Sequence, residues 1–195
     1  MNVESMSLPG LVLITPRLFG DARGHFIETW QAERYAAHGL PSQWVQDNLS
    51  RSVRGVLRGL HYQLPKAQGK LVYVLEGEVL DTALDIRAGS PTFGRFETVA
   101  LSAENRRQLY VPPGFAHGFV VVSERATVAY KCTELYHPEF ERGVRWDDPR
   151  MQIPWPVEQP ILSPKDAALP RLDDVPAELL PKYVGEDAAA TETAD

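Results

Sequence analysis

Residues that can carry out proton chemistry and bind an anion lie close together in the stretch VLRGLHYQLPKAQGK, residues 56–70. His61 can act as a general base near pH 7 in its neutral form. Lys70 can stabilise a developing enolate oxygen, and Arg58 can hold a phosphate through two hydrogen bonds. A single buried histidine is more often structural, so the prediction of a pocket for proton abstraction from an anionic ligand rests on the whole set.

The spacing of these residues predicts β-strands, with a turn at Glu76-Gly77-Glu78. Side chains alternate between the two faces of a strand, so His61 and Gln63 share one face. Arg58 lies three residues before His61 and would point to the other side of a regular strand. Both can reach one pocket only if Gly59 introduces a kink or bulge, which we therefore predict.

Short segments rich in β-branched and aromatic residues recur along the chain, separated by turn signals such as Ala-Gly-Ser-Pro and Pro-Pro-Gly. This pattern predicts an all-β fold, a cupin-type jelly-roll barrel or sandwich with a few short helices. Helices are expected at 31–38 and near 173–180. We expect one jelly-roll domain over residues 1–172 and a C-terminal extension over 173–195, whose acidic tail GEDAAATETAD is disordered.

The 195-residue chain has a formal net charge of −6 and a pI of about 5.4. This mildly acidic balance argues against nucleic acid or an anionic membrane as the main partner. The single cysteine, Cys132, excludes an intrachain disulfide and is typical of a reducing compartment. Since neither a signal peptide nor an apolar stretch long enough to span a membrane is evident, we expect a cytoplasmic protein.

A cupin barrel with inward histidines raises the question of a metal. The usual pattern has two histidines at i and i+2, a glutamate a few residues later and a distant histidine. After His61, position i+2 is Gln63, and no glutamate follows before Glu76. His117 could be the distant ligand, which leaves too few ligands for a transition-metal site. We expect no metal and no other cofactor, and a chelator that abolished activity would contradict this.

Long, ordered blocks of sequence carry a resemblance to a known family. They are FGDARGHFIETW, VQDNLSRSVRGVLRGLHYQ, QGKLVYVLEGEVLDTALDIRAGSPTFG, LSAENRRQLYVPPGFAHGFVVVS, YKCTELYHPEFERGVRWDDP and LSPKD. Through them the chain resembles the dTDP-4-dehydrorhamnose 3,5-epimerase family, cofactor-free cupin enzymes of dTDP-L-rhamnose synthesis, over nearly all of residues 8–172. The resemblance implies an isomerase acting on dTDP-4-dehydro-6-deoxy-D-glucose, whose C4 ketone acidifies the protons on C3 and C5.

The resemblance implies catalytic roles for His61, Asp166, Lys70 and Tyr130. His61 would remove each proton as the general base, and Asp166 in LSPKD would fix its tautomer and stabilise the imidazolium. Lys70, helped by Arg58, would stabilise the enolate at O4.

Tyr130 would reprotonate the opposite face of the sugar. A base that returned its own proton would give exchange without inversion, so a second group is required. Tyr136 is the rival of Tyr130 for this role.

The resemblance also implies a homodimer in which the strands before Trp30, with few obvious partners in a single jelly roll, extend the sheet of a second chain. Without the resemblance, the default interpretations would be a strand-end turn at QDN and an exposed salt bridge between Arg23 and Glu28. The implied contacts with the dTDP-sugar are Arg23, Phe26 and Glu28 from the partner subunit, Gln46, Asp47 and Asn48 around thymidine, Arg58 at the diphosphate, and His117, Tyr136, Glu141 and Lys165.

Other functions stay open at this stage. A single-centre epimerase of another deoxysugar pathway, inverting C3 or C5 alone, would share most of these blocks. A sugar-nucleotide 3,4-ketoisomerase should lack the LSPKD and YKCT blocks as a set. A non-catalytic cupin that binds a sugar nucleotide would be expected to have lost His61 or Tyr130. The product's destination is expected to be a bacterial surface polysaccharide, such as the O-antigen of lipopolysaccharide, with an antibiotic sugar as the alternative.

Overall fold

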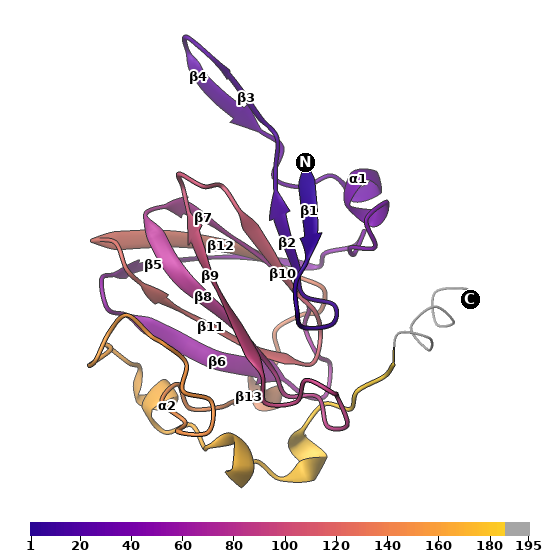
Figure 1. Cartoon of the computed structure of the whole chain (residues 1–195), viewed down its shortest axis with the longest axis vertical. Coiled ribbons are helices and arrows are strands. Elements are labelled where there is room, and N and C mark those ends of the chain that lie inside the picture. The colour runs from indigo at the N-terminus through magenta and orange to yellow at the C-terminus, as the bar shows by residue number, and fades with distance from the viewer. Residues whose placement is uncertain (186–195) are drawn as a thin grey trace.

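Two antiparallel β-sheets face each other in the computed structural model, which describes residues 1–185 (Figure 1). This arrangement confirms the predicted all-β jelly roll. The six-stranded sheet has the order β1 (Asn2–Ser5), β2 (Val12–Thr15), β10 (Gln108–Val111), β7 (Lys70–Glu76), β12 (Arg125–Cys132) and β5 (Gln46–Val53). The five-stranded sheet has the order β13 (Glu141–Gly143), β6 (Leu57–Gln63), β11 (Phe115–Val121), β8 (Glu78–Asp85) and β9 (Phe96–Ser102). Residues 186–195, most of the predicted disordered tail, lie outside the described residues.

Apolar side chains from both sheets fill the space between them. Val72 of β7 belongs to the same buried cluster as Val79 and Ala83 of β8. The chain passes from one sheet to the other at the predicted turn, where Gly77 has a φ of +76°. A Cβ there would lie 2.0 Å from the backbone oxygen of Arg125, so glycine is required at this crossing.

The C-terminal part of the chain covers the outer face of the five-stranded sheet (Figure 1). Leu60 and Tyr62 of β6 point outward into a buried cluster that also contains Leu172, and Leu180 packs against it. His61, between them in the strand, therefore points inward, as the alternation predicts. The domain boundary at residue 172 stays a prediction, since the chain beyond it continues across the same sheet.

The structure confirms one of the two predicted helices, replaces the other with turns, and adds a short helix that was not predicted. Helix α1 (Ala32–Ala36) lies within the expected range. In place of a helix near 173–180, the chain forms two 3₁₀ turns, Leu172–Asp174 and Ala177–Leu179. Pro176 lies between them and disfavours a helical residue before it. The short helix α2 (Pro164–Ala167) is the additional one.

The N-terminal strands do not all lack partners within the chain, which corrects part of the expectation. β1 pairs with β2, and β2 pairs with β10 of the six-stranded sheet. Only the hairpin of β3 (Leu18–Asp21) and β4 (Gly24–Ile27) forms a separate two-stranded sheet, which projects from the body (Figure 1).

The predicted irregularity at Gly59 is confirmed. Between the pairs His117–His61 and Phe119–Arg58, one residue of β11 opposes two of β6. Gly59 has a φ of +119°, and a Cβ there would lie 2.6 Å from the Cα of the facing glycine of β11. The extra residue turns Arg58 and His61 toward the same cavity.

Gly59→Ala is expected to lower the free energy of unfolding by about 2–4 kcal/mol, because it combines a strained φ with overpacking. Gly55→Ala is the matched control, since Gly55 has a φ of +80° but open space around it. The control should cost only about 1 kcal/mol. Urea unfolding of both variants checks this, and equal losses would show that the close approach to β11 does not matter.

Candidate active site

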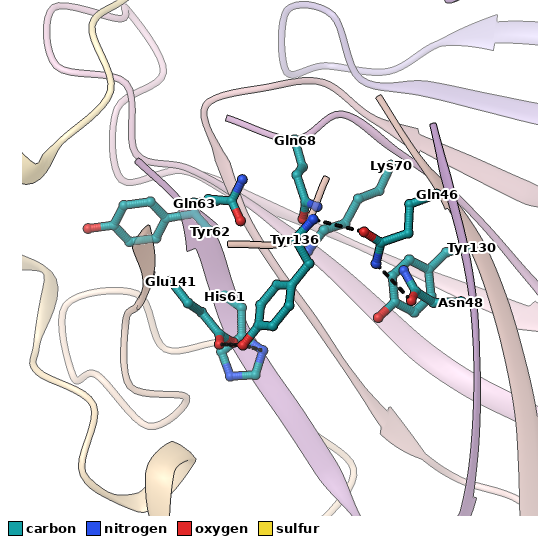
Figure 2. Close-up of a pocket in the computed structure, with 10 residues that line it drawn as sticks. All are labelled: Gln46, Asn48, His61, Tyr62, Gln63, Gln68, Lys70, Tyr130, Tyr136 and Glu141. Carbon is teal, nitrogen blue, oxygen red and sulfur yellow. Dashed lines mark hydrogen bonds and ion pairs between the residues drawn. The ribbon is translucent and has the colours of Figure 1, made fainter. Parts of the chain in front are cut away.

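One cleft brings most of the predicted residues together. Two adjoining cavities, of about 300 Å³ and about 290 Å³, share His61, Lys70, Tyr130 and Glu141 in their walls. Figure 2 shows the first cavity, where side chains converge from strands of both sheets. Its other lining residues are Gln46, Asn48, Tyr62, Gln63, Gln68 and Tyr136, and those of the second cavity are Ser50, Arg58, His117, Gly118, Phe119, Ser163, Lys165 and Asp166.

His61 and Asp166 form a hydrogen-bonded pair, although 105 residues separate them along the chain. Nε2 of His61 lies 2.5 Å from Oδ1 of Asp166. Asp166 lies in α2, and its Oδ2 accepts a hydrogen bond from the hydroxyl of the capping residue Ser163. Burial by itself raises the pKa of the Asp166 carboxyl, but hydrogen bonds from His61, Ser163 and the Gly59 backbone outweigh it and lower the pKa below its ordinary value. An ionised carboxylate therefore holds Nε2 of the imidazole and leaves Nδ1 free for chemistry.

Glu141 lies on the other side of the imidazole, with Oε1 at 3.9 Å from Nδ1 of His61. Its Oε2 accepts a hydrogen bond from the Tyr136 hydroxyl, drawn in Figure 2, and forms an ion pair with Lys165. Burial by itself raises the pKa of the Glu141 carboxyl, but Lys165, Tyr136 and His61 outweigh it and lower the pKa. The bond to Glu141 raises the pKa of Tyr136 to about 12, so that proton is firmly held.

Lys70 and Tyr130 face the cleft from the neighbouring strands β7 and β12. Nζ of Lys70 lies 6.0 Å from the centroid of the Tyr130 ring. Burial lowers the pKa of the Lys70 ammonium and raises the pKa of the Tyr130 phenol. Tyr130 therefore keeps its proton at neutral pH. The ammonium group of Lys70, when protonated, interacts strongly with a negative charge that develops in the cleft, because it is buried there.

Arg58 and His117 line the second cavity. Nε of Arg58 donates to the hydroxyl of Ser52 at 3.1 Å. Nε2 of His117 lies 2.9 Å from Oδ1 of Asp81, and both side chains are buried. The guanidinium of Arg58 adds a positive charge to this part of the cleft, which can therefore receive an anionic ligand.

Asp47 is the one residue of the QDN stretch that does not reach the cleft. Gln46 and Asn48 line the first cavity, and their side chains are hydrogen-bonded to each other at 3.0 Å. Asp47 points to the opposite face of β5, where both carboxylate oxygens lie 3.0 Å from Nζ of Lys131.

Arg23, Phe26 and Glu28 also lie apart from the cleft of their own chain, on or next to the projecting hairpin (Figure 1). The side chain of Arg23 is 90% exposed and pairs with Asp21. Phe26 is 66% exposed, and Glu28 pairs with Arg34 at 3.4 Å. Within one chain Arg23 and Glu28 therefore each pair with another residue, and the default interpretation of a salt bridge between the two was wrong.

Two supporting residues were missed by the sequence analysis, although each had a signal. Ser163 stands three residues before Asp166, the spacing of a helix N-cap and an acidic residue at N3. Asp81 is an acidic residue inside the apolar strand EVLDTALD, on the face that it shares with the buried Ala83.

Across residues 1–185, no group of three or more His, Cys, Asp or Glu side chains is arranged to hold a metal ion. None of the helices found in that part of the chain is long and apolar enough to span a membrane.

Comparisons with known proteins agree with the sequence resemblance. The family described as dTDP-4-dehydrorhamnose 3,5-epimerase matches residues 5–174. A dTDP-4-dehydrorhamnose 3,5-epimerase of Pseudomonas aeruginosa is 52% identical over 168 residues, covering 85% of this chain and 93% of that protein.

Solved structures agree with this. The crystal structure of a dTDP-6-deoxy-D-glucose-3,5-epimerase from Legionella pneumophila, in complex with dTDP-4-keto-L-rhamnose, is 54% identical, with a TM-score of 0.92 and coverage of 94% of this chain and 99% of that chain. A 3'-monoepimerase from Streptomyces bikiniensis, in complex with dTDP-quinovose, is 36% identical, with a TM-score of 0.85 and coverage of 91% and 92%. The chain therefore belongs to the dTDP-4-dehydrorhamnose 3,5-epimerase family.

Proposed function

We propose that this chain is an isomerase that converts dTDP-4-dehydro-6-deoxy-D-glucose to dTDP-4-dehydro-L-rhamnose by inverting C3 and C5. Family membership supports the reaction. The observation that carries the proposal is the cleft itself, in which the His61–Asp166 pair meets Lys70 and Tyr130. This is a set for removing a proton, holding an enolate and returning a proton.

His61 is the proposed base, acting through Nδ1. Because Nε2–H donates to the Asp166 carboxylate, the lone pair is on Nδ1, which faces the cleft near Glu141. The C4 ketone makes the protons on C3 and C5 acidic, so each can pass to Nδ1 in turn. Asp166 and Glu141 then flank the imidazolium and stabilise its charge.

Lys70, with Arg58, is proposed to stabilise the negative charge on O4 of the enolate. Tyr130 is the proposed donor to the opposite face, since it holds its proton and lines the cleft. The hydroxyl of its rival Tyr136 is already bonded to Glu141, which favours Tyr130.

For the nucleotide end, Gln46 and Asn48 are proposed to bind thymidine, and Arg58 the diphosphate. Asp47 is left out of this set because its side chain pairs with Lys131 on the outer face. His117, Tyr136, Glu141 and Lys165 remain the other proposed substrate contacts.

A homodimer is proposed in which each hairpin of β3 and β4 reaches the cleft of the partner. The exposed ring of Phe26 lies 6.5 Å from the exposed ring of Phe19, and the two form an apolar surface on a hairpin that is a separate two-stranded sheet. Arg23 and Glu28 would arrive at the substrate with it. Cytoplasmic location and delivery of the sugar to a surface polysaccharide also stay proposals.

Mixing two inactive chains is expected to restore activity if the hairpin crosses to the partner. One chain carries His61→Asn, and the other carries Arg23→Ala and Phe26→Ala. If the two co-expressed chains associate at random, about half of the dimers are mixed, and each mixed dimer contains one intact site of its two. Activity should therefore recover to about a quarter of the wild-type value. No recovery, or full activity of the hairpin variant alone, would contradict the shared site.

The product distinguishes the double epimerase from a single-centre relative. Incubation with dTDP-4-dehydro-6-deoxy-D-glucose, without added metal or nicotinamide, should give a product inverted at both carbons by NMR. Inversion at one carbon alone would favour the monoepimerase alternative. Binding without turnover would favour a non-catalytic sugar-nucleotide binder.

A further inference from the structure

The inner face of β5 is polar along its whole length. Alternate residues point inward from this edge strand of the six-stranded sheet, and all are amides or hydroxyls: Gln46, Asn48, Ser50 and Ser52. Most of them have a partner within the chain. The two amides are bonded to each other, and the hydroxyl of Ser52 accepts from Arg58.

Ser50 is the exception. Its Oγ is buried and has no hydrogen-bond partner among residues 1–185. A buried hydroxyl without a partner costs free energy, so such groups are rare unless a ligand or water satisfies them. The side chain lines the second cavity, together with His61, Lys70 and Tyr130.

The register of the sheet places Ser50 within the chemical part of the cleft. Asn48 pairs with Tyr130 across β5 and β12, and Ser50 is the next inward residue along the strand, in the direction of Ser52 and Arg58. Ser50 therefore lies between the proposed proton donor and the proposed diphosphate contact. Since the sugar must lie beside the donor, we expect one of its oxygens to reach this position.

We propose that Ser50 is a further substrate-binding residue, whose hydroxyl donates a hydrogen bond to an oxygen of the keto-sugar. This rests on the proposed function of the cleft. A serine hydroxyl can turn about its single χ1 bond, so the same group can meet an acceptor that enters the cavity.

Ser50→Ala tests this contact, with Thr82→Val as the matched control. The hydroxyl of Thr82 is also buried and without a partner in the described part of the chain. It lies on the face of β8 that it shares with Leu84, which packs under the C-terminal segment away from the cleft. Both changes remove one unpaired hydroxyl, but only the first removes it from the cavity.

Ser50→Ala is expected to lower kcat/KM for dTDP-4-dehydro-6-deoxy-D-glucose about tenfold, the effect of one lost hydrogen bond. The affinity for dTDP, measured by calorimetry, and the Tm should stay at or above the wild-type values. Thr82→Val should leave turnover and dTDP affinity unchanged. Wild-type turnover in the Ser50 variant would overturn the contact with the sugar. A loss of dTDP affinity as large as the loss in kcat/KM would also overturn it. An inactive wild-type enzyme would instead overturn the proposed function, and this contact with it.

Discussion

The His61→Asn variant is expected to lose about 10²–10⁴-fold in turnover while it binds dTDP with nearly unchanged affinity. Asparagine can still donate to the Asp166 carboxylate, so the cleft should keep its shape. It has no basic nitrogen in place of Nδ1, so protons on C3 and C5 would no longer be removed. Initial rates by NMR and dTDP binding by calorimetry measure the two effects separately.

His38→Asn is the matched control for this prediction. His38 is exposed just beyond α1 and lines neither cavity of the cleft. Its variant should turn over at the wild-type rate. If His61→Asn kept more than about a tenth of wild-type turnover, general-base catalysis by this histidine would be too small for the assigned role.

Tyr130→Phe is expected to separate proton exchange from inversion. Without the phenol, the enolate can recover a proton only from the face that holds the imidazolium, which restores the starting configuration. In deuterated water the substrate should therefore gain deuterium while the inverted product falls by about 10²-fold or more. NMR of the recovered substrate and product measures both quantities in one sample.

Tyr136→Phe provides the comparison for the donor assignment. It removes the same hydroxyl from the residue whose proton is held by Glu141, and it keeps the ring of Tyr136 in the wall of the cleft. Inversion should persist in this variant, at a lower rate because Glu141 loses a hydrogen-bond partner. Loss of inversion in Tyr136→Phe but not in Tyr130→Phe would reverse the assignment.

The fold was predictable because its signals are local. Alternation of polar and apolar residues located the strands, and the single glycine between Arg58 and His61 was enough to predict the bulge that turns both into one cavity. The prediction of a helix near 173–180 was wrong because Pro176 separates two 3₁₀ turns there. The short helix α2 is stabilised by its Ser163 cap and by a contact with the distant His61, so its local sequence did not predict it.

The candidate site was harder to predict from the sequence, since its residues are far apart along the chain. Nothing local joins His61 to Asp166, and only the resemblance to a family suggested the pair that the structure brings together. Asp47 was grouped with its neighbours by adjacency, although strand alternation alone places it on the opposite face. The contacts of Glu141 with Tyr136 and Lys165 depend on how a loop and α2 meet over the sheet, which no local pattern encodes.

Deuterium incorporation by the wild-type protein is the most direct test of the central claim. The protein would be incubated with dTDP-4-dehydro-6-deoxy-D-glucose in deuterated water, without added metal or nicotinamide, and C3 and C5 followed by NMR. Proton abstraction by His61 and opposite-face return by Tyr130 predict deuterium at both carbons of an inverted product. The absence of deuterium from both carbons would contradict the account.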